Sequence, residues 1–251
     1  MTRRARRVCV TRRARRVCET RSVDALVLWD IDGTLVHAGG MGAEVFDRAF
    51  EHALGVRPPE RVLMSGKTDP QIVGEYLAML GVPDAAAHLP AVLAALETEL
   101  AAAEDAIRSM GRVLPGAVEA IEGLATEVGV LQSVLTGNIA PNARLKLAAF
   151  GLDSLLDLEV GAYGSDHADR RKLVPIALER VSRVRSRSFD RSRVWIVGDS
   201  ANDLACARSG GVRCLLVATG RSGRDELAAL APDAVLDDLS DTGSLLEIIA
   251  S

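Results

Sequence analysis

The 251-residue sequence has few aromatic side chains and no long apolar run. Aromatic residues make up only 3% of it, so a folded core must be built mainly from leucine, valine, isoleucine and alanine. No uninterrupted apolar run approaches the roughly 18 to 20 residues that a membrane span requires, so we expect no transmembrane helix and no membrane partner. The apolar fraction of 48% and the charged fraction of 25% are ordinary for a globular protein.

Cysteine and histidine are also scarce, with four of each. Cys206 and Cys214 fall in apolar stretches, whereas Cys9 and Cys18 lie near the start of the chain. Four cysteines without metal-ligand spacing are too few for a disulfide framework, and they fit a reducing, cytoplasmic setting. The histidines are scattered, with no H-x-x-x-H pair, so we expect no zinc site.

Positive charge is concentrated at the start of the chain. The first 21 residues hold nine arginines and one glutamate, a net charge of +8, and because the whole chain carries −4 the remainder carries −12. Such an acidic body argues against an extended nucleic-acid-binding face. Nucleic acid is therefore an unlikely partner on composition, and a basic arm in this segment is the alternative that would reverse this expectation.

The basic segment is a repeat, because residues 2–10 (TRRARRVCV) and 11–19 (TRRARRVCE) differ in one position. Two copies cannot build a solenoid. Like charges at this density predict that residues 1–23 form a disordered basic tail. We interpret it as a functionless extension or a start codon assigned too far upstream, and we expect a chain that begins near Ser22 to fold and work normally.

Short apolar runs alternate with helical patterns along the rest of the chain. Runs typical of buried strands lie at Ala25–Trp29, Val130–Leu135, Val194–Val197 and Cys214–Ala218. Helical patterns lie at Pro115–Val128, Pro141–Phe150, Leu173–Val184, Ala201–Ser209 and Arg224–Leu230. This alternation predicts an α/β fold with a doubly wound parallel sheet.

Residues 39–111 break the alternation. They contain helical patterns at Ala43–Leu54, Pro70–Leu80 and Ala91–Met110 and no convincing strand. We therefore predict an all-helical cap domain over residues 39–111, inserted into a core formed by residues 24–38 and 112–251. Glycines at both ends of the insertion would serve as hinges, and the cap would lie over the strand ends, where open α/β sheets bind ligands.

Four polar motifs mark the chain, and three of them directly follow a predicted strand. Residues 30–34 read DIDGT, residues 136–138 read TGN, residues 170–172 read RRK and residues 198–203 read GDSAND. Two carboxylates two residues apart can face one site if the chain turns at Gly33. The TGN segment can surround an anion with short donors, because glycine lets backbone N–H groups approach closely.

The other two motifs supply charge. Arginine or lysine at residues 170–172 can balance phosphoryl oxygens, and the acids of residues 198–203 can complete an oxygen ligand set for Mg²⁺. Alone, each motif has an ordinary explanation as a turn, an exposed basic face or a helix N-cap. Four such motifs in this order are hard to explain as accidental turns.

With these four motifs the chain resembles the haloacid dehalogenase superfamily over about residues 24–240, and the helical insertion resembles the cap of its phosphoglycolate phosphatase-like branch. The resemblance implies a Rossmann-like core and a Mg²⁺-dependent phosphatase that hydrolyses a small phosphomonoester through an aspartyl-phosphate. A phosphomutase of the β-phosphoglucomutase type and a non-catalytic binding protein on the same fold are the alternatives. The small phosphorylated metabolite and the oligomeric state stay open.

The resemblance also implies residue roles. Asp30 would be the nucleophile, and Asp32 the general acid and then the base. Mg²⁺ would bind the carboxylates of Asp30 and Asp199 and the backbone carbonyl of Asp32, while Asp203 would orient a ligand or the cation. Crowding by like charge is expected to raise the pKa of Asp32. An acid at this position favours phosphatase or mutase chemistry, because carbon–halogen cleavage needs no proton on the leaving group.

The phosphoryl oxygens would be bound by Thr136, Gly137 and Asn138. Counting back from Pro175 in the resembled pattern makes Arg170 the phosphate-neutralising cation, with Lys172 as its rival, and a guanidinium suits this role because it meets phosphate oxygens bidentately.

Residues 66–68 (GKT) imitate the end of a P-loop. The first glycine of that motif is replaced by Arg61, however, and no strand precedes it. We interpret residues 65–69 as a cap loop that faces the site. Lys67 then either contacts an anionic part of the substrate, which would make it a specificity residue, or is a plain surface residue.

Overall fold

The computed structural model describes residues 24–251, so the predictions made for the basic tail lie outside the described residues. A five-stranded sheet has the order β4–β1–β5–β6–β7, and every neighbouring pair is parallel. Its strands are β1 (Ala25–Trp29), β4 (Val130–Val134), β5 (Val194–Gly198), β6 (Arg213–Val217) and β7 (Ala234–Leu236). The predicted fold class, a doubly wound parallel sheet, is confirmed.

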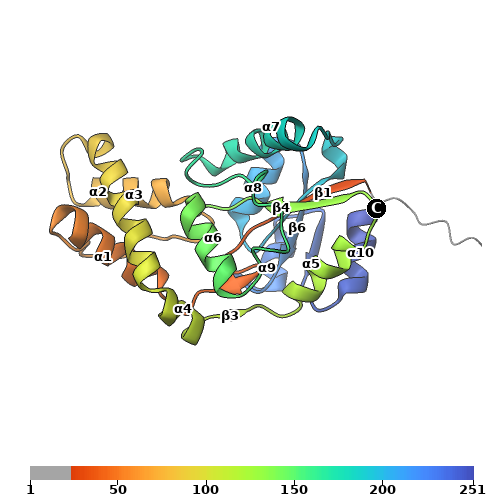
Figure 1. The fold of residues 1–251 in the computed structure, drawn as a ribbon, viewed down its shortest axis with the longest axis horizontal. Helices are drawn as coiled ribbons and strands as arrows, with labels where there is room; N and C mark the ends of the chain where they lie inside the picture. The colour runs from red at the N-terminus through yellow and green to blue at the C-terminus, as the bar shows by residue number, and fades with distance from the viewer. Residues whose placement is uncertain (1–23) are drawn as a thin grey trace, which may run out of the picture.

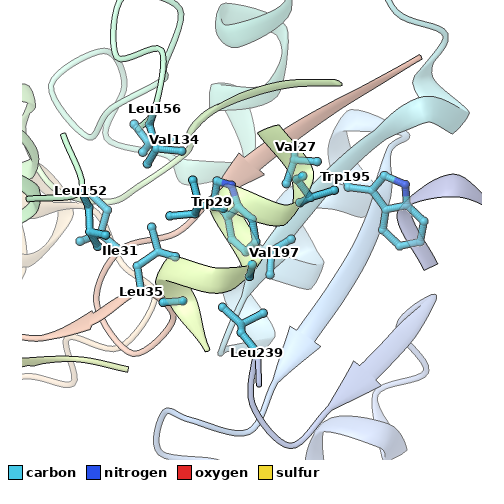
Figure 2. Close-up of a cluster of buried hydrophobic side chains, with 14 of the residues drawn as sticks. Val27, Trp29, Ile31, Leu35, Val134, Leu152, Leu156, Trp195, Val197 and Leu239 are labelled. Atoms are coloured by element: carbon cyan, nitrogen blue, oxygen red, sulfur yellow. The ribbon is translucent and has the colours of Figure 1, made fainter. Parts of the chain in front are cut away.

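Strand β1 lies between β4 and β5 and is buried on both faces. Val27 and Trp29 point into one apolar cluster, and Leu26 and Leu28 into another, as the two-residue period of a strand requires. Figure 2 shows part of the first cluster, with Trp29 among Val27, Ile31 and Val197. A strand without a polar position is typical of a parallel sheet covered on both sides.

Helices cover both faces of the sheet (Figure 1). The first cluster is completed by α5 (Ala117–Ala125), α6 (Ala140–Ala149) and α10 (Thr242–Ala250). The second is completed by α7 (Leu173–Arg185), α8 (Ala201–Gly210) and α9 (Arg224–Ala229). Two 3₁₀ turns, η1 (Arg170–Lys172) and η2 (Arg191–Arg193), precede α7 and β5.

Four further helices form a layer of their own to one side of the sheet (Figure 1). They are α1 (Gly42–Leu54), α2 (Asp69–Met79), α3 (Ala85–Ala102) and α4 (Glu104–Met110). Their apolar faces share a separate cluster, in which the rings of Phe50 and Tyr76 meet edge to face at 5.3 Å. We call this layer the cap. Its cluster, which also includes Ala149 of α6, supports a division of the chain at residues 39–111, which stays a prediction.

The two chain segments that join the cap to the sheet pair with each other. Strand β2 (Val36–His37) runs antiparallel to β3 (Arg112–Val113). A side chain on Gly39 would press against Met110, and Gly39 has a φ of 66°, so this crossing point requires glycine. The cap is therefore attached through a short paired ribbon and not through two independent linkers.

Several element boundaries differ from those that the sequence predicts. The single helix predicted at Ala91–Met110 is two helices, because α3 begins at Ala85, continues through Pro90 and ends before Ala103. Pro90 lies inside α3 and cannot donate a backbone hydrogen bond, yet the helix continues past it. The edge strand β7 was not predicted, since its three residues are only half-buried. No helix within residues 24–251 combines the length and apolar character needed to cross a membrane.

Candidate active site

The first motif turns sharply at the end of β1. Gly33 has a φ of 84°, and a Cβ built on it would lie 2.5 Å from Oδ2 of Asp199. Only glycine fits this turn, because L-residues rarely adopt the angle and the space is occupied. The hydroxyl of Thr219 donates to the Gly33 carbonyl at 2.6 Å and fixes the turn. Asp30 and Asp32 consequently face the same cavity.

Three buried carboxylates gather at the ends of β1 and β5. Oxygen atoms of Asp30, Asp199 and Asp203 all lie within 4.8 Å of one another. The guanidinium of Arg170 is the cation among them, 3.1 Å from Oδ2 of Asp30 and in contact with Asp203. Three negative charges against one positive charge leave an excess of about two, which matches a divalent cation with oxygen ligands such as Mg²⁺.

This crowding perturbs the carboxyl groups. Burial raises the pKa of Asp30; Arg170 opposes this effect and Asp203 adds to it. Burial also raises the pKa of Asp199, and the charges of Asp203 and Asp30 raise it further. Each carboxyl thus holds a proton more strongly than a free aspartate does.

Asp203 is occupied by protein partners at both oxygens. Oδ1 contacts Arg170, while Oδ2 accepts from the backbone N–H of Ser200 at 3.0 Å and from its hydroxyl at 2.6 Å. These bonds join the start of α8 to Arg170. The geometry supports an orienting role for Asp203, and Asp199, whose side chain lines the cavity, is the better placed ligand.

Of the two rival cations, the structure places Arg170 at the site. Its side chain is 5% exposed and lines the cavity, whereas Lys172 is exposed on η1. Arg171, between them, pairs with Asp169 at 2.9 Å and also faces solvent. The three-residue basic run therefore contributes one charge to the active site.

The TGN segment follows β4 and lies beside Asp32. The amide nitrogen of Asn138 donates to Oδ2 of Asp32 at 2.8 Å and to the hydroxyl of Thr136 at 2.9 Å. Through these bonds the Asn138 side chain holds the Asp32 carboxylate, in addition to any contact that it makes with phosphate. The Thr136 hydroxyl accepts, so its own hydrogen can be donated into the cavity that it lines.

Lys146 on α6 is a site residue that the sequence reasoning missed. Its Nζ donates to Oδ2 of Asp32 at 2.6 Å and to Oδ1 of Asn138 at 2.7 Å. It falls on the buried face of the helix, with Asn142, Ala143 and Leu147. A lysine at an apolar position of a helical pattern is the signal that would have found it, since buried lysines are nearly always paired.

Lys146 also corrects the expectation for the pKa of Asp32. Like-charge crowding was predicted to raise it, but the pKa is lowered. Burial does raise it, yet the charge and hydrogen bond of Lys146, helped by the Asn138 amide, outweigh burial. The prediction was wrong because it counted the carboxylates around Asp32 and not the ammonium.

The loop before α2 closes over the site, as the sequence predicts for residues 65–69. The backbone N–H of Asp69 donates to the Gly137 carbonyl at 2.8 Å, and Oδ2 of Asp69 accepts from the N–H of Ile139 at 2.8 Å. A side chain on Gly137 would collide with the carbonyl of Lys67. This close contact between the cap loop and the TGN segment explains why glycine stands between Thr136 and Asn138.

Lys67 lines the cavity, but its charge is partly compensated, because Nζ lies 2.5 Å from Oε2 of Glu75. The cavity measures about 350 Å³ and has apolar walls at Phe46, Met64 and Ile72. Its floor carries the polar groups already described. Such a space accepts a small molecule held by a few polar groups.

Comparison with known proteins shows which family these motifs belong to. The family model for haloacid dehalogenase-like hydrolases matches residues 27–208, which contain all four motifs. The chain belongs to this family. It is 30% identical over 224 residues to a phosphoglycolate phosphatase of Rhodospirillum rubrum, covering 88% of this chain and 90% of the relative. It is 29% identical over 226 residues to one of Pseudomonas fluorescens, covering 85% and 76%.

Solved structures share the fold. A hydrolase from Pseudomonas syringae superimposes with a TM-score of 0.66 at 19% identity, over 90% of this chain and 99% of that one. The predicted family and enzyme class, a phosphatase of the haloacid dehalogenase-like hydrolases, are confirmed. The roles of individual residues stay predictions, for which the geometry above is the support.

Proposed function

We propose that the protein is a Mg²⁺-dependent phosphatase that hydrolyses a small phosphomonoester through an aspartyl-phosphate on Asp30. The observation that carries this proposal is the cluster of Asp30, Asp199 and Asp203 around Arg170 at the floor of the cavity. It combines a buried nucleophile, an excess of negative charge and, 44% exposed beside it, the carboxylate of Asp32.

The residues present fit a divalent cation. Hard oxygen donors and unbalanced negative charge are what Mg²⁺ requires, and oxygen atoms of Asp30, Asp199 and Asp203 lie within 4.8 Å of one another. The carboxylates of Asp30 and Asp199 and the backbone carbonyl of Asp32 would hold it. When bound, Mg²⁺ supplies positive charge that screens Asp30 from a phosphate dianion.

In the first step a carboxylate oxygen of Asp30 attacks phosphorus and forms the aspartyl-phosphate bond. The bond between phosphorus and the ester oxygen breaks, and Asp32 gives its proton to that oxygen, which leaves as an alcohol. Arg170 holds Asp30 in place and adds positive charge beside the phosphoryl group. An incoming phosphate dianion favours protonation of Asp32, because added negative charge raises a neighbouring carboxyl pKa.

In the second step water attacks the aspartyl-phosphate. Asp32, now ionised, accepts a proton from this water, the acyl-phosphate bond breaks, and inorganic phosphate leaves with Asp30 restored. Thr136 and backbone groups of the TGN segment are placed to donate to the phosphoryl oxygens throughout. The cap loop docked on Gly137 limits the space and the water around the reaction.

The cavity and the relatives support a small metabolite as substrate. A volume of about 350 Å³ is at the lower end for ligand sites. Both relatives named above are phosphoglycolate phosphatases. We therefore place phosphoglycolate first among the compounds to be tested, and we propose the cytoplasm as the compartment, where the free thiols of Cys206 and Cys214 would stay reduced.

The test is a phosphate-release screen over small phosphomonoesters with Mg²⁺, using the wild type, Asp30→Asn and Asp153→Asn. A carboxamide is a poor nucleophile, and uncatalysed monoester hydrolysis needs up to ~10²¹-fold acceleration, so Asp30→Asn should release almost nothing. Asp153 is exposed and outside the cavity, so its variant should match the wild type. Intact-mass measurement after acid quenching should detect a phosphorylated wild type.

Loss of release in Asp30→Asn and in EDTA would support the proposal and rank the substrates. Equal release by wild type and Asp30→Asn would refute Asp30 as nucleophile. Interconversion of sugar phosphates without net phosphate release would establish the mutase alternative instead.

A further inference from the structure

Two buried cations line the candidate active site, and each pairs with a different carboxylate. Arg170 lies against Asp30, whereas Lys146 lies against Asp32. Lys146 is 8% exposed, so its ammonium group is withdrawn from water and stabilised mainly by these partners. We infer that Lys146 is a positioning residue for Asp32, which rests on the proposed phosphatase function and on Asp32 as its acid and base.

The contacts fix which oxygen of Asp32 meets the substrate. Oδ2 accepts from Nζ of Lys146 at 2.6 Å and from Nδ2 of Asn138 at 2.8 Å. With Oδ2 held by two donors, Oδ1 is the atom that presents the proton to the leaving oxygen. The carboxylate is 44% exposed toward the cavity, and without these donors it could rotate about its side-chain bonds.

Lys146 is itself held firmly. Its second bond, to Oδ1 of Asn138 at 2.7 Å, closes a ring of three side chains, since Asn138 also bonds Asp32. The helix that carries it begins at the TGN segment, where the N–H of Ile139 is bound by Asp69. Helix α6 therefore links the TGN segment, which would bind phosphate, to Asp32, which would act as the acid.

The ammonium group of Lys146 also suits the negative charge that Asp32 gains during the reaction. When Asp32 transfers its proton to the leaving oxygen, a carboxylate remains, and Lys146 stabilises it at a distance of 2.6 Å. Lys146 is consequently needed where proton transfer is needed. In this first step, a leaving group that departs readily as an anion should make little demand on Asp32 or on Lys146; the later attack of water is the same for every substrate.

This distinction gives a test with two substrates. An alkyl phosphate needs a proton on its leaving oxygen, whereas p-nitrophenyl phosphate does not. Lys146→Met should lower kcat/KM, which reports the first step, about 100-fold on the alkyl ester, the lower end of general acid–base effects, with a much smaller loss on the aryl ester. Arg144→Met is the matched control, because Arg144 stands on the same helix but bonds the Leu158 carbonyl away from the cavity; both rates should persist.

A double-mutant cycle with Asp32→Asn completes the test. If Lys146 acts through Asp32, adding Lys146→Met to Asp32→Asn should cause no further loss on either substrate. Equal losses on both substrates, or independent losses in the cycle, would overturn the inference. Lys146→Gln, which keeps one hydrogen-bond donor, replaces Lys146→Met if circular dichroism shows that the latter is unfolded. If the wild type hydrolyses neither ester, the proposed function itself fails.

Discussion

The guanidinium of Arg170 lies 3.1 Å from Oδ2 of Asp30 and bridges it to Asp203. All three side chains are buried. The bridge joins residues that are 173 positions apart in the sequence, one at the end of β1 and the other in the first turn of α8, which follows the adjacent strand β5. It connects the stability of the fold to the orientation of Asp30, the proposed nucleophile, and both effects can be measured.

Arg170→Met should lower activity and destabilise the protein, while Lys172→Met should do neither. Removing one partner of a buried ion pair leaves uncompensated charge and costs about 3 to 5 kcal/mol. Lys172 is exposed, and its replacement should change the free energy of unfolding by less than about 0.5 kcal/mol. Urea denaturation and phosphate release measure the two effects. The reverse ranking of the variants would assign the cation to Lys172.

Mg²⁺ should stabilise the folded protein through the carboxylate cluster. A ligand that binds only the folded state at 100 times its Kd adds about 2.7 kcal/mol, so Tm should rise with added Mg²⁺ and fall back with EDTA. Asp199→Asn should abolish this shift, because it removes a carboxylate that lines the cavity. Asp153→Asn should keep it. A full shift in Asp199→Asn would mean that the ion binds elsewhere.

Much of the site could be predicted because parallel strands end at one edge of a sheet. The apolar runs located β1, β4 and β5, and the residues that follow them necessarily meet: Asp30 and Asp32 after β1, Thr136 and Asn138 after β4, and Asp199 after β5. The positions of the strands and their parallel order are enough to bring these residues together. The lengths of the loops do not matter.

Residues that reach the site from inside a helix or from the cap could not be placed in this way. Lys146 lies two turns into α6, away from any strand end, and only its position on the apolar face of the helical pattern marks it. Asp69 stands at the first position of α2 and reads as an ordinary helix-start acid. Its contact with the TGN segment depends on how the cap packs on the sheet, which no local pattern encodes.

The prediction for Lys67 can be tested through its partner. Nζ lies 2.5 Å from Oε2 of Glu75, which masks the positive charge in the cavity. If Lys67 contacts an anionic part of the substrate, Lys67→Met should raise KM. Glu75→Gln should lower KM, because it frees the ammonium while keeping the shape of the side chain. Steady-state kinetics on the best substrate measures both changes. An unchanged KM in both variants would make Lys67 a surface residue with a structural ion pair.

The carboxyl of Asp69 should make stability depend on pH. Burial raises its pKa to about 6 from 3.8, against the opposing effects of Lys146 and the Ile139 N–H and with a further rise from Asp32. Between these two values the folded protein keeps the proton that the unfolded chain releases. The contribution of Asp69 to stability is therefore complete below about pH 4 and is lost as pH rises through about 6.

Asp69→Asn removes this loss. The amide oxygen can still accept from the Ile139 N–H, but no ionisation has to be suppressed. Relative to the wild type, the variant should gain up to about 3 kcal/mol between about pH 4 and pH 7, since each pKa unit corresponds to 1.36 kcal/mol. Urea denaturation of both proteins in EDTA across this range gives the difference directly, because the other titrating groups cancel. A difference that stays constant with pH would mean that Asp69 ionises as readily in the folded protein as in the unfolded chain.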